Sequence, residues 1–330
     1  MKICIYGLGA IGGLVAARLA RSGQHVSAVA RGVTLDAVRR EGLLLLERDG
    51  DNDRRTRVEI EASDRPGDLG EQDLVVLTVK TTGLAQVAHD IGPLLGPRTA
   101  VLSMMNGVQW WFFHGLAQRP PGLRLESVDP GGAIAAAIPP EHVIGSVTHL
   151  SSASPEPGVI RHGMGERIIV GEPSGGQSGR SMAAIDALRR GGFQVEEAPR
   201  IQSEIWFKLW GNMTMNPVSA ITGATGDRIL DDDLVRGFLS RCMREAAQIG
   251  ARIGLPIDVD PEARHAVTRA LGALRTSMLQ DVEAGRMVEL DALVASVVEI
   301  GAACGVPTPD IETLLGLARL HARVRGLYPG

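Results

Sequence analysis

The sequence predicts an α/β fold in which a parallel-sheet domain is followed by an all-α domain. Three observations lead to this prediction. A short apolar strand runs directly into a glycine-rich loop at residues 7–12, strand-like and helix-like segments alternate up to about residue 198, and helical segments fill the chain after Pro199. Alternation of this kind indicates a parallel sheet with right-handed crossovers. The predicted domains are therefore 1–198 and 199–330.

Composition agrees with two ordinary globular domains and argues against several classes of function. At 330 residues the chain can bury two cores, and a net charge of −4 gives no basic surface for nucleic acid. The three cysteines are far apart, so we expect neither disulfides nor a metal site. The apolar run near residue 1 is too short for a signal peptide, so none is expected, and no apolar window reaches the roughly 18–20 residues that a membrane span needs. We expect a cytoplasmic protein without membrane contact.

The predicted elements follow in chain order. In the first domain, strands are expected at 1–6, 25–30, 73–79 and 99–104, with helices from residue 10 to about 22 and at 82–95. Pieces at 143–148, 158–160 and 167–171 indicate antiparallel additions to the sheet edge, and a helix at 181–190 and a strand at 193–197 follow. Residues 49–57 are expected to form a charged turn between strands, as a solvated loop. The second domain should contain helices near 201–216, 234–253, 261–284, 288–304 and 309–325.

The loop Gly7-Leu8-Gly9-Ala10-Ile11-Gly12 lies between the first strand and an apolar helix. Gly7 permits a tight turn, Gly9 lets the backbone approach a pyrophosphate, and Gly12 lets the helix pack closely on the strand. The helix N-terminus then faces the negative phosphates. This context makes the first domain a Rossmann-type dinucleotide-binding domain.

The end of the second strand indicates which dinucleotide is bound. An acidic residue there would accept a hydrogen bond from the ribose of NAD, whereas this chain has Arg31, whose charge suits the 2′-phosphate of NADP. The alternative is that Arg31 is only a solvated surface residue.

Lys208, Asn212 and Asn216 recur every four residues in the helical half, so they fall on one narrow helix face. Trp206 and Trp210 make the surroundings apolar. Burial there should lower the pKa of Lys208, which would suit a proton donor near neutral pH. The alternative is a lysine that snorkels past an apolar face, with asparagines near the helix end. Ser277 and Glu289 look ordinary by periodicity alone.

Taken together, these motifs resemble the ketopantoate reductase family over nearly the whole chain. The matching segments are GLGAIG at 7–12, Arg31, Val79-Lys80-Thr81, Asn106-Gly107, Pro157-Gly158-Val159-Ile160, Trp206–Lys208 with Asn212 and Asn216-Pro217, and Ser277–Asp281 with Glu289. The resemblance implies that NADPH reduces the 2-oxo acid ketopantoate to pantoate, for pantothenate and coenzyme A synthesis. No metal is implied.

The resemblance also implies residue roles. Lys208 matches the general acid that protonates the carbonyl oxygen, and Glu289 matches the carboxylate that holds the substrate hydroxyl. Asn106, Asn212, Asn216 and Ser277 match substrate contacts. Asn106 also matches a residue beside the nicotinamide, and Lys80 one near the cofactor.

Three departures from the family pattern bear on the substrate. Gly226 stands where many members have an asparagine, so one substrate contact of the family is missing. In addition, Ser152 replaces an alanine, and aromatic residues fill positions 110–113. The aromatic segment could line a larger apolar pocket or pack against the helical domain. A reductase of the same family acting on another 2-oxo acid or small ketone therefore stays an alternative, as does an NADP-binding sensor without catalysis. The apolar helical domain is compatible with a homodimer.

Overall fold

The computed structural model describes residues 1–50 and 52–329, which form two compact units. The first unit contains Met1–Met105 and Ala133–Ile201, and the second contains Asn106–Gly132 and Gln202–Gly330. The chain thus passes into the helical unit close to the predicted boundary after residue 198. The difference is the segment 106–132, which belongs to the helical unit although it lies within the first predicted domain.

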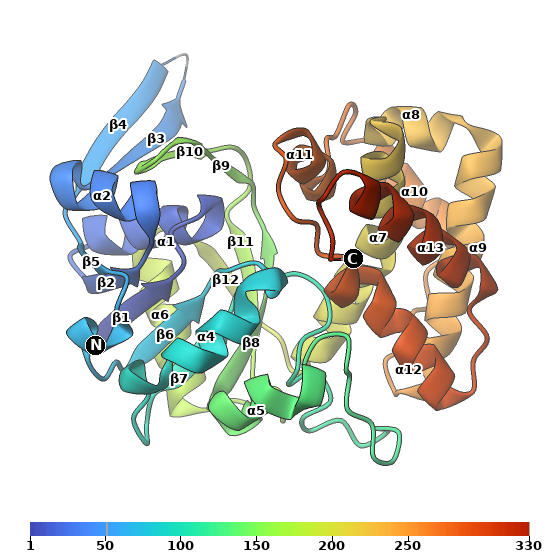
Figure 1. The fold of residues 1–330 in the computed structure, drawn as a ribbon, viewed down its shortest axis with the longest axis horizontal. Helices are drawn as coiled ribbons and strands as arrows, with labels where there is room; N and C mark the ends of the chain where they lie inside the picture. The colour runs from blue at the N-terminus through green and yellow to red at the C-terminus, as the bar shows by residue number, and fades with distance from the viewer. Residues whose placement is uncertain (51, 330) are drawn as a thin grey trace. The chain divides into compact units, whose positions relative to one another are not determined.

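The first unit is built on an 8-stranded sheet with the order β12-β11-β8-β7-β6-β1-β2-β5 (Figure 1). Its strands are β1 (Lys2–Tyr6), β2 (His25–Val29), β5 (Glu61–Ser63), β6 (Leu74–Leu77), β7 (Ala100–Ser103), β8 (Val143–His149), β11 (Arg167–Gly171) and β12 (Gln194–Glu197). In the sheet order, the six strands β8, β7, β6, β1, β2 and β5 run parallel, so the antiparallel pairing expected for 143–148 is wrong. Strand β11 is antiparallel to β8, as expected for 167–171. The predicted α/β class is confirmed.

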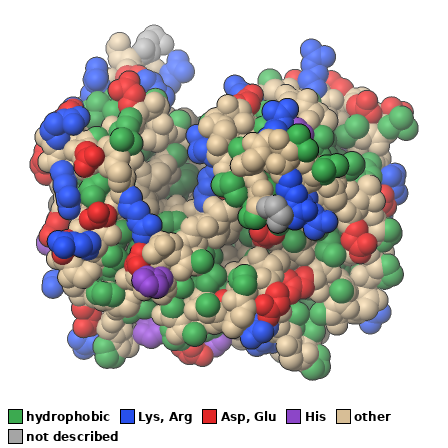
Figure 2. Space-filling view, viewed as in Figure 1, with side chains coloured by type: hydrophobic (Ala, Val, Ile, Leu, Met, Phe, Trp, Pro, Cys, Tyr) green, Lys and Arg blue, Asp and Glu red, His purple; other side chains and the backbone are tan. Residues whose placement is uncertain are grey.

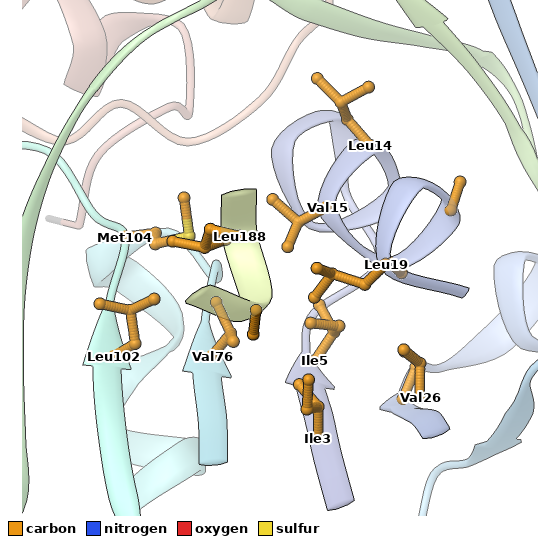
Figure 3. Packing of buried hydrophobic residues seen from close by; sticks show 14 of the residues in the cluster. Ile3, Ile5, Leu14, Val15, Leu19, Val26, Val76, Leu102, Met104 and Leu188 are labelled. Atoms are coloured by element: carbon orange, nitrogen blue, oxygen red, sulfur yellow. The ribbon is translucent and has the colours of Figure 1, made fainter. Parts of the chain in front are cut away.

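The centre of this sheet is apolar on both faces because its short strands are rich in Val, Leu and Ile. All four residues of β6 and of β7 are buried. Helix α1 (Ala10–Arg21) packs on one face, where its Val15 and Leu19 lie close to Ile5 of β1 (Figure 3). Such two-sided burial is typical of parallel sheets covered by helices. This packing of the strands and of α1 fixes the positions of the strand ends.

A second, 4-stranded sheet with the order β4-β3-β10-β9 was not predicted. It consists of β3 (Leu43–Asp49), β4 (Asn52–Val58), β9 (Ser152–Glu156) and β10 (Val159–His162). Strands do flank the charged segment expected at 49–57, but they extend into it, since β3 and β4 form an antiparallel hairpin, so the loop was predicted too long; Asp51 lies outside the described residues. The expectation that residues 158–160 extend the main sheet is also wrong, because β10 pairs in parallel with β3.

This second sheet packs against α1. A Cβ at Gly13 would lie 2.3 Å from Ile160 Cδ1, so the glycine permits the close approach of α1 and β10. Arg18 of α1 is buried and donates from Nε to Glu47 of β3 at 2.8 Å. Sequence reasoning missed the sheet because its two halves are about a hundred residues apart, and local periodicity carries no information on such pairing.

The remaining helices of the first unit connect the strands. They are α2 (Gly32–Glu41), α3 (Pro66–Leu69), η1 (Thr81–Gly83), α4 (Leu84–Asp90), η2 (Gly92–Leu94), α5 (Ala133–Ala137), η4 (Pro140–His142) and α6 (Gly179–Arg190). The short turn η3 (Pro130–Gly132) ends the segment that belongs to the second unit. The helix predicted at 82–95 is thus interrupted, and α4 with its flanking short turns takes its place. Gly92-Pro93 explains the interruption, because the residue before a proline disfavours helix.

The second unit is helical. Its helices are α7 (Ile201–Thr222), α8 (Gly226–Asp231), α9 (Asp233–Arg252), α10 (Pro261–Arg269), α11 (Ser277–Glu283), the π-helical turn η5 (Asp291–Ala295), α12 (Ser296–Cys304) and α13 (Pro309–Val324). Two predicted bounds were wrong. Helix α7 continues through Pro217 to Thr222, and the predicted helix at 261–284 is two helices, since Thr276 caps a new one through its side chain.

The segment 106–132 is tied to the helices of its own unit. Gln202 Nε2 donates to the carbonyl of His114 at 2.9 Å, and Glu299 of α12 accepts from the backbone N–H groups of Glu126 and Ser127. Phe112 is fully buried with its ring centroid 6.1 Å from that of Trp206. Trp111–Phe113 therefore pack against the helices and do not line a larger pocket.

Candidate active site

The glycine loop has the backbone that a dinucleotide requires. Gly7 directly follows β1 with φ +105°, and a Cβ at Gly12 would lie 2.0 Å from the carbonyl oxygen of Gly7. By contrast, a Cβ at Gly9 would meet no atom within 4 Å. Two glycines are thus required by the fold itself, whereas the third, at the N-cap of α1, has open space beside it. That space lies where the helix N-terminus favours an anion.

Thr78 adds a contact that the sequence did not suggest. Its hydroxyl donates to the carbonyl of Gly7 at 2.7 Å and stands 2.3 Å from where a Cβ at Gly12 would be. Thr78 directly follows β6, so the neighbouring strand end fixes the loop. Among the other predicted cofactor residues, Leu8 is buried and Lys80 is the N-cap of η1, three residues after β6 ends.

Arg31 is the N-cap residue of α2, at the end of β2. Its guanidinium lies 2.8 Å from Asp90 Oδ2 at the C-terminal end of α4, while its side chain stays 52% exposed. Hydrogen bonds from His89 and Gln86, together with Arg31, lower the pKa of Asp90 below its ordinary value. Asp90 was not predicted, because no local pattern reveals a partner 59 residues away. A half-exposed pair of this kind is weak and can yield to a stronger anion.

In the second unit, Lys208 and Asn106 meet directly. The Lys208 ammonium donates to Asn106 Oδ1 at 2.9 Å. Asn106 comes three residues after β7 yet belongs to the helical unit, so the lysine and the amide are held within one unit. The two residues are 102 positions apart, and only the resemblance to a known family had placed them in one site.

The environment of Lys208 tunes its proton affinity. Desolvation by burial lowers the pKa of Lys208 to about 8, and the negative charge of Glu289 opposes this shift by raising it. The lowered pKa predicted from the apolar flanks is confirmed. A lysine with this pKa is mostly protonated at neutral pH and still releases its proton readily.

The other predicted substrate residues are positioned unequally. Asn212 and Asn216 follow Lys208 at intervals of four on α7, with Asn216 buried. Ser277 is the exposed first residue of α11, and within residues 1–50 and 52–329 no hydrogen bond joins it to Lys208 or Asn106. The structure therefore brings Lys208 together with Asn106 through a hydrogen bond and with Glu289 through the attraction of opposite charges. Among the described residues, no hydrogen bond connects Ser277 to this group.

Close backbone packing fixes Asn106 beside the turn η5. Gly107 has φ +80°, and a Cβ there would lie 2.4 Å from the carbonyl oxygen of Ala292. The Val108 N–H donates to the same oxygen at 2.8 Å. π-Helical turns occur frequently at functional sites, and this one begins two residues after Glu289.

The C-terminal residues hold the same turn from its other end. The Tyr328 hydroxyl donates to Asp291, the first residue of η5, and the Val288 N–H donates to the carbonyl of Leu327 at 3.0 Å. Burial raises the pKa of Asp291, while burial and the neighbouring Asp291 raise that of Tyr328 to about 12. Glu289 thus stands between two anchored positions, neither of which had a signal in the sequence.

Three further properties of the described residues bear on possible ligands and partners. Within 1–50 and 52–329 there is no group of three His, Cys, Asp or Glu side chains that could hold a metal ion. None of the helices in this part of the chain has both the length and the apolar character that crossing a bilayer takes. On the face drawn in Figure 2, basic and acidic side chains are interspersed.

Comparison with known proteins gives matches to both halves of the chain. The family model described as "Ketopantoate reductase PanE/ApbA" matches residues 3–111, and the model "Ketopantoate reductase PanE/ApbA C terminal" matches residues 200–322. A curated protein from Mesorhizobium japonicum, named 2-dehydropantoate 2-reductase, is 44% identical over 329 residues, covering 99% of this chain and 100% of that protein.

Solved structures agree. A crystal structure from Ralstonia solanacearum, described as a candidate ketopantoate reductase, is 53% identical with a TM-score of 0.93 and covers 99% of each chain. A 2-dehydropantoate 2-reductase from Geobacter metallireducens is 26% identical with a TM-score of 0.84, covering 97% of this chain and 99% of the other. The likeness thus extends over both units.

Proposed function

This chain belongs to the ketopantoate reductase family, and we propose that it uses NADPH to reduce 2-dehydropantoate to pantoate, a step in the synthesis of pantothenate and coenzyme A. The similar protein from Mesorhizobium japonicum carries this activity in its name. The substrate is a 2-oxo acid, so the reaction needs a hydride for the carbonyl carbon and a proton for the carbonyl oxygen.

The residues of the first unit fit the cofactor. The open space beside Gly9 leaves room for a pyrophosphate at the N-terminus of α1. Arg31 would hold the 2′-phosphate after exchanging its Asp90 partner, and Lys80 and the rest of the loop, Leu8 and Ala10–Gly12, would complete the site. When bound there, NADPH supplies the hydride.

The second unit provides the proton and the substrate contacts. Lys208 Nζ stabilises the negative charge that develops on the carbonyl oxygen and then donates its proton. Asn106 orients this ammonium through its Oδ1, and Glu289 keeps it protonated by raising its pKa. Asn212, Asn216 and Ser277 are proposed to bind the substrate, and Glu289 to hold its hydroxyl. Residues 1–198 would then bind the cofactor and 199–330, with Asn106, the substrate.

The observation that carries this proposal is the 2.9 Å hydrogen bond from Lys208 to Asn106, made by a lysine whose pKa is about 8. A lysine that merely snorkels to solvent keeps its ordinary pKa and needs no amide to orient it. The alternative of a sensor without catalysis gives no reason for such an arrangement.

A steady-state assay of NADPH oxidation with ketopantoate tests the proposal. Turnover is expected in the unmodified protein, together with loss of turnover and retention of NADPH binding in Lys208→Ala. Tight NADPH binding without turnover of any 2-oxo acid would instead support the sensor.

A second candidate is reduction of a different 2-oxo acid or small ketone by the same residues. Gly226 favours it, because the asparagine that many family members have there is absent. Comparing kcat/KM for ketopantoate with that for a panel of 2-oxo acids decides between the two. A better substrate in the panel would replace ketopantoate without changing the roles of Lys208 and Glu289.

Two further assignments complete the proposal. Cys4, Cys242 and Cys304 are free thiols, which fits a reducing compartment, and we propose the cytoplasm. A homodimer is proposed as the state in solution, and light scattering of the purified protein will show whether its mass is twice that of the chain.

A further inference from the structure

Arg264 of α10 is a partly buried cation without an anionic partner. Within residues 1–50 and 52–329, its Nε is buried without a hydrogen-bond partner and no carboxylate forms an ion pair with it. Desolvation alone lowers the pKa of its guanidinium from the ordinary value. Removing a charged group from water is costly unless a counter-charge compensates for it. An unpaired arginine in such a place therefore indicates a site for an anion.

The position of Arg264 relates it to Lys208. A Cβ at Gly211 of α7 would lie 3.2 Å from Arg264 Nε. Gly211 comes three residues after Lys208, and side chains at this interval on a helix are neighbours, about 5–6 Å apart at Cβ. The guanidinium thus lies against the side of α7 that carries Phe207 and Gly211, next to the proposed proton donor Lys208. Any side chain larger than that of glycine at position 211 would therefore crowd the guanidinium of Arg264.

The same face of α10 adjoins the position where the family asparagine is missing. Thr268, one helical turn after Arg264, lies 3.9 Å from where a Cβ at Gly226 would be, and its hydroxyl donates to the carbonyl of Arg264. Arg264 and Thr268 thus lie on neighbouring turns of α10, and Thr268 is the residue that lies close to Gly226. Because Gly226 has no side chain with which to bind a substrate, a polar group of α10 is well placed to bind it instead.

We propose that Arg264 binds the carboxylate of the 2-oxo acid and takes over the role that an asparagine at position 226 would have. This inference rests on the proposed function, because it concerns the substrate of that reaction. A guanidinium suits the role, since it matches a carboxylate with two parallel hydrogen bonds and stays protonated even when buried. Lys208, in contrast, must give up its charge during turnover and cannot serve as the permanent counter-ion.

The Arg264 guanidinium also lies 5.5 Å from the ring centroid of Phe207, which, like Gly211, is a residue of α7. This cation–π contact holds the guanidinium plane but neutralises no charge and accepts no hydrogen bond from Nε. Phe207 thus pre-positions the arginine and leaves its donors for an anion. If the contact with Phe207 were its only role, Arg264 could be replaced without effect on substrate binding.

The test compares the full-length protein with Arg264→Gln, which removes the charge, and Arg264→Lys, which keeps it. Arg264→Gln is expected to raise the KM for ketopantoate and the inhibition constant of pantoate by roughly 10- to 100-fold, with a much smaller change in kcat. Arg264→Lys should recover part of this loss. Arg244→Gln, which alters an exposed arginine of α9, is the matched control and should behave as wild type.

Two additional measurements separate carboxylate binding from a general structural effect. The neutral lactone of ketopantoate, which has no carboxylate, should show little change in KM between wild type and Arg264→Gln. Gly211→Ala, which places a methyl 3.2 Å from Nε without altering charge, should raise the KM for the acid in the same direction. It also serves as the test if Arg264→Gln does not fold, as judged by thermal denaturation.

The inference is overturned if the KM for ketopantoate stays within about twofold of wild type in the Arg264 variants, or if the KM for the lactone rises as much as that for the acid. These outcomes leave the proposed function intact when wild type turns over ketopantoate. If wild type reduces no 2-oxo acid at all, the proposed function itself is wrong and this inference falls with it.

Discussion

At the scale of single residues, Lys208 combines a partly buried position with a charge that the reaction must consume. Lys208→Ala is expected to lower kcat by about a hundredfold or more, because the developing oxyanion loses its proton donor. In the unmodified protein kcat should fall as pH rises through about 8, where the ammonium loses its proton. A pH series of kcat at saturating substrate measures both effects. Near-normal kcat in Lys208→Ala would remove its assigned role.

Arg31 determines the choice of cofactor in this proposal. Arg31→Asp should weaken NADPH binding more than NADH binding, because the change replaces an attractive charge at the 2′-phosphate by a repulsive one. Fluorescence titration of both cofactors provides the comparison. Arg65→Asp, an exposed arginine of the same unit, is a suitable control. Equal weakening of both cofactors would show that Arg31 does not bind the phosphate.

Residue types and their spacing indicated much of the site but not its partners. Lys208, Asn212 and Asn216 share a face by helical periodicity alone, and the glycine loop has its own signature. Asp90, the partner of Arg31, could not be found in this way, because its position depends on how α4 lies against the end of β2. Contacts of this kind follow from tertiary packing.

At the scale of secondary-structure elements, different glycines of the loop joining β1 to α1 serve folding and cofactor binding. Gly9→Ala should leave thermal stability nearly unchanged, because its Cβ meets nothing, and yet weaken NADPH binding by intruding on the phosphate space. Gly12→Ala should impair both, since its Cβ would lie 2.0 Å from the Gly7 carbonyl oxygen and 2.3 Å from Thr78 Oγ1. Thermal denaturation and NADPH titration of this pair provide the readout. Equal loss of stability in the two variants would contradict this division.

The turn η5 connects the C-terminal residues with Glu289. Tyr328→Phe removes the hydrogen bond to partly buried Asp291, which should cost about 1–3 kcal/mol in unfolding free energy. A looser turn would weaken the influence of Glu289 on Lys208, so the pKa of Lys208 should fall and the alkaline decline of kcat should move to lower pH. Denaturation curves and the pH series measure the two effects.

Val324→Ala is the control for this change, because that side chain is 79% exposed near the end of α13. If Tyr328→Phe lowers stability but leaves the pH profile of kcat unchanged, the C-terminal contact stabilises the fold without acting on Lys208.

At the scale of the whole molecule, the distribution of tryptophans offers a probe of each unit. Trp110, Trp111, Trp206 and Trp210 all belong to the second unit, so intrinsic fluorescence reports its unfolding alone. NADPH at a hundred times its Kd stabilises the unit that binds it by about 2.7 kcal/mol. We expect the thermal transition seen by circular dichroism to rise with NADPH more than the tryptophan transition does. Identical shifts would mean that the two units unfold as one.

The sequence by itself determined the fold class, the dinucleotide loop and the helical character of the second half. Each of these follows from local periodicity and from the positions of glycines, which depend on only one or two neighbouring elements of secondary structure. Tertiary structure alone decided the second sheet, the transfer of Asn106 and the aromatic segment to the helical unit, and, within the described part of the chain, the unpaired state of Arg264. These features join residues from distant parts of the chain, and their positions depend on packing that no local pattern encodes.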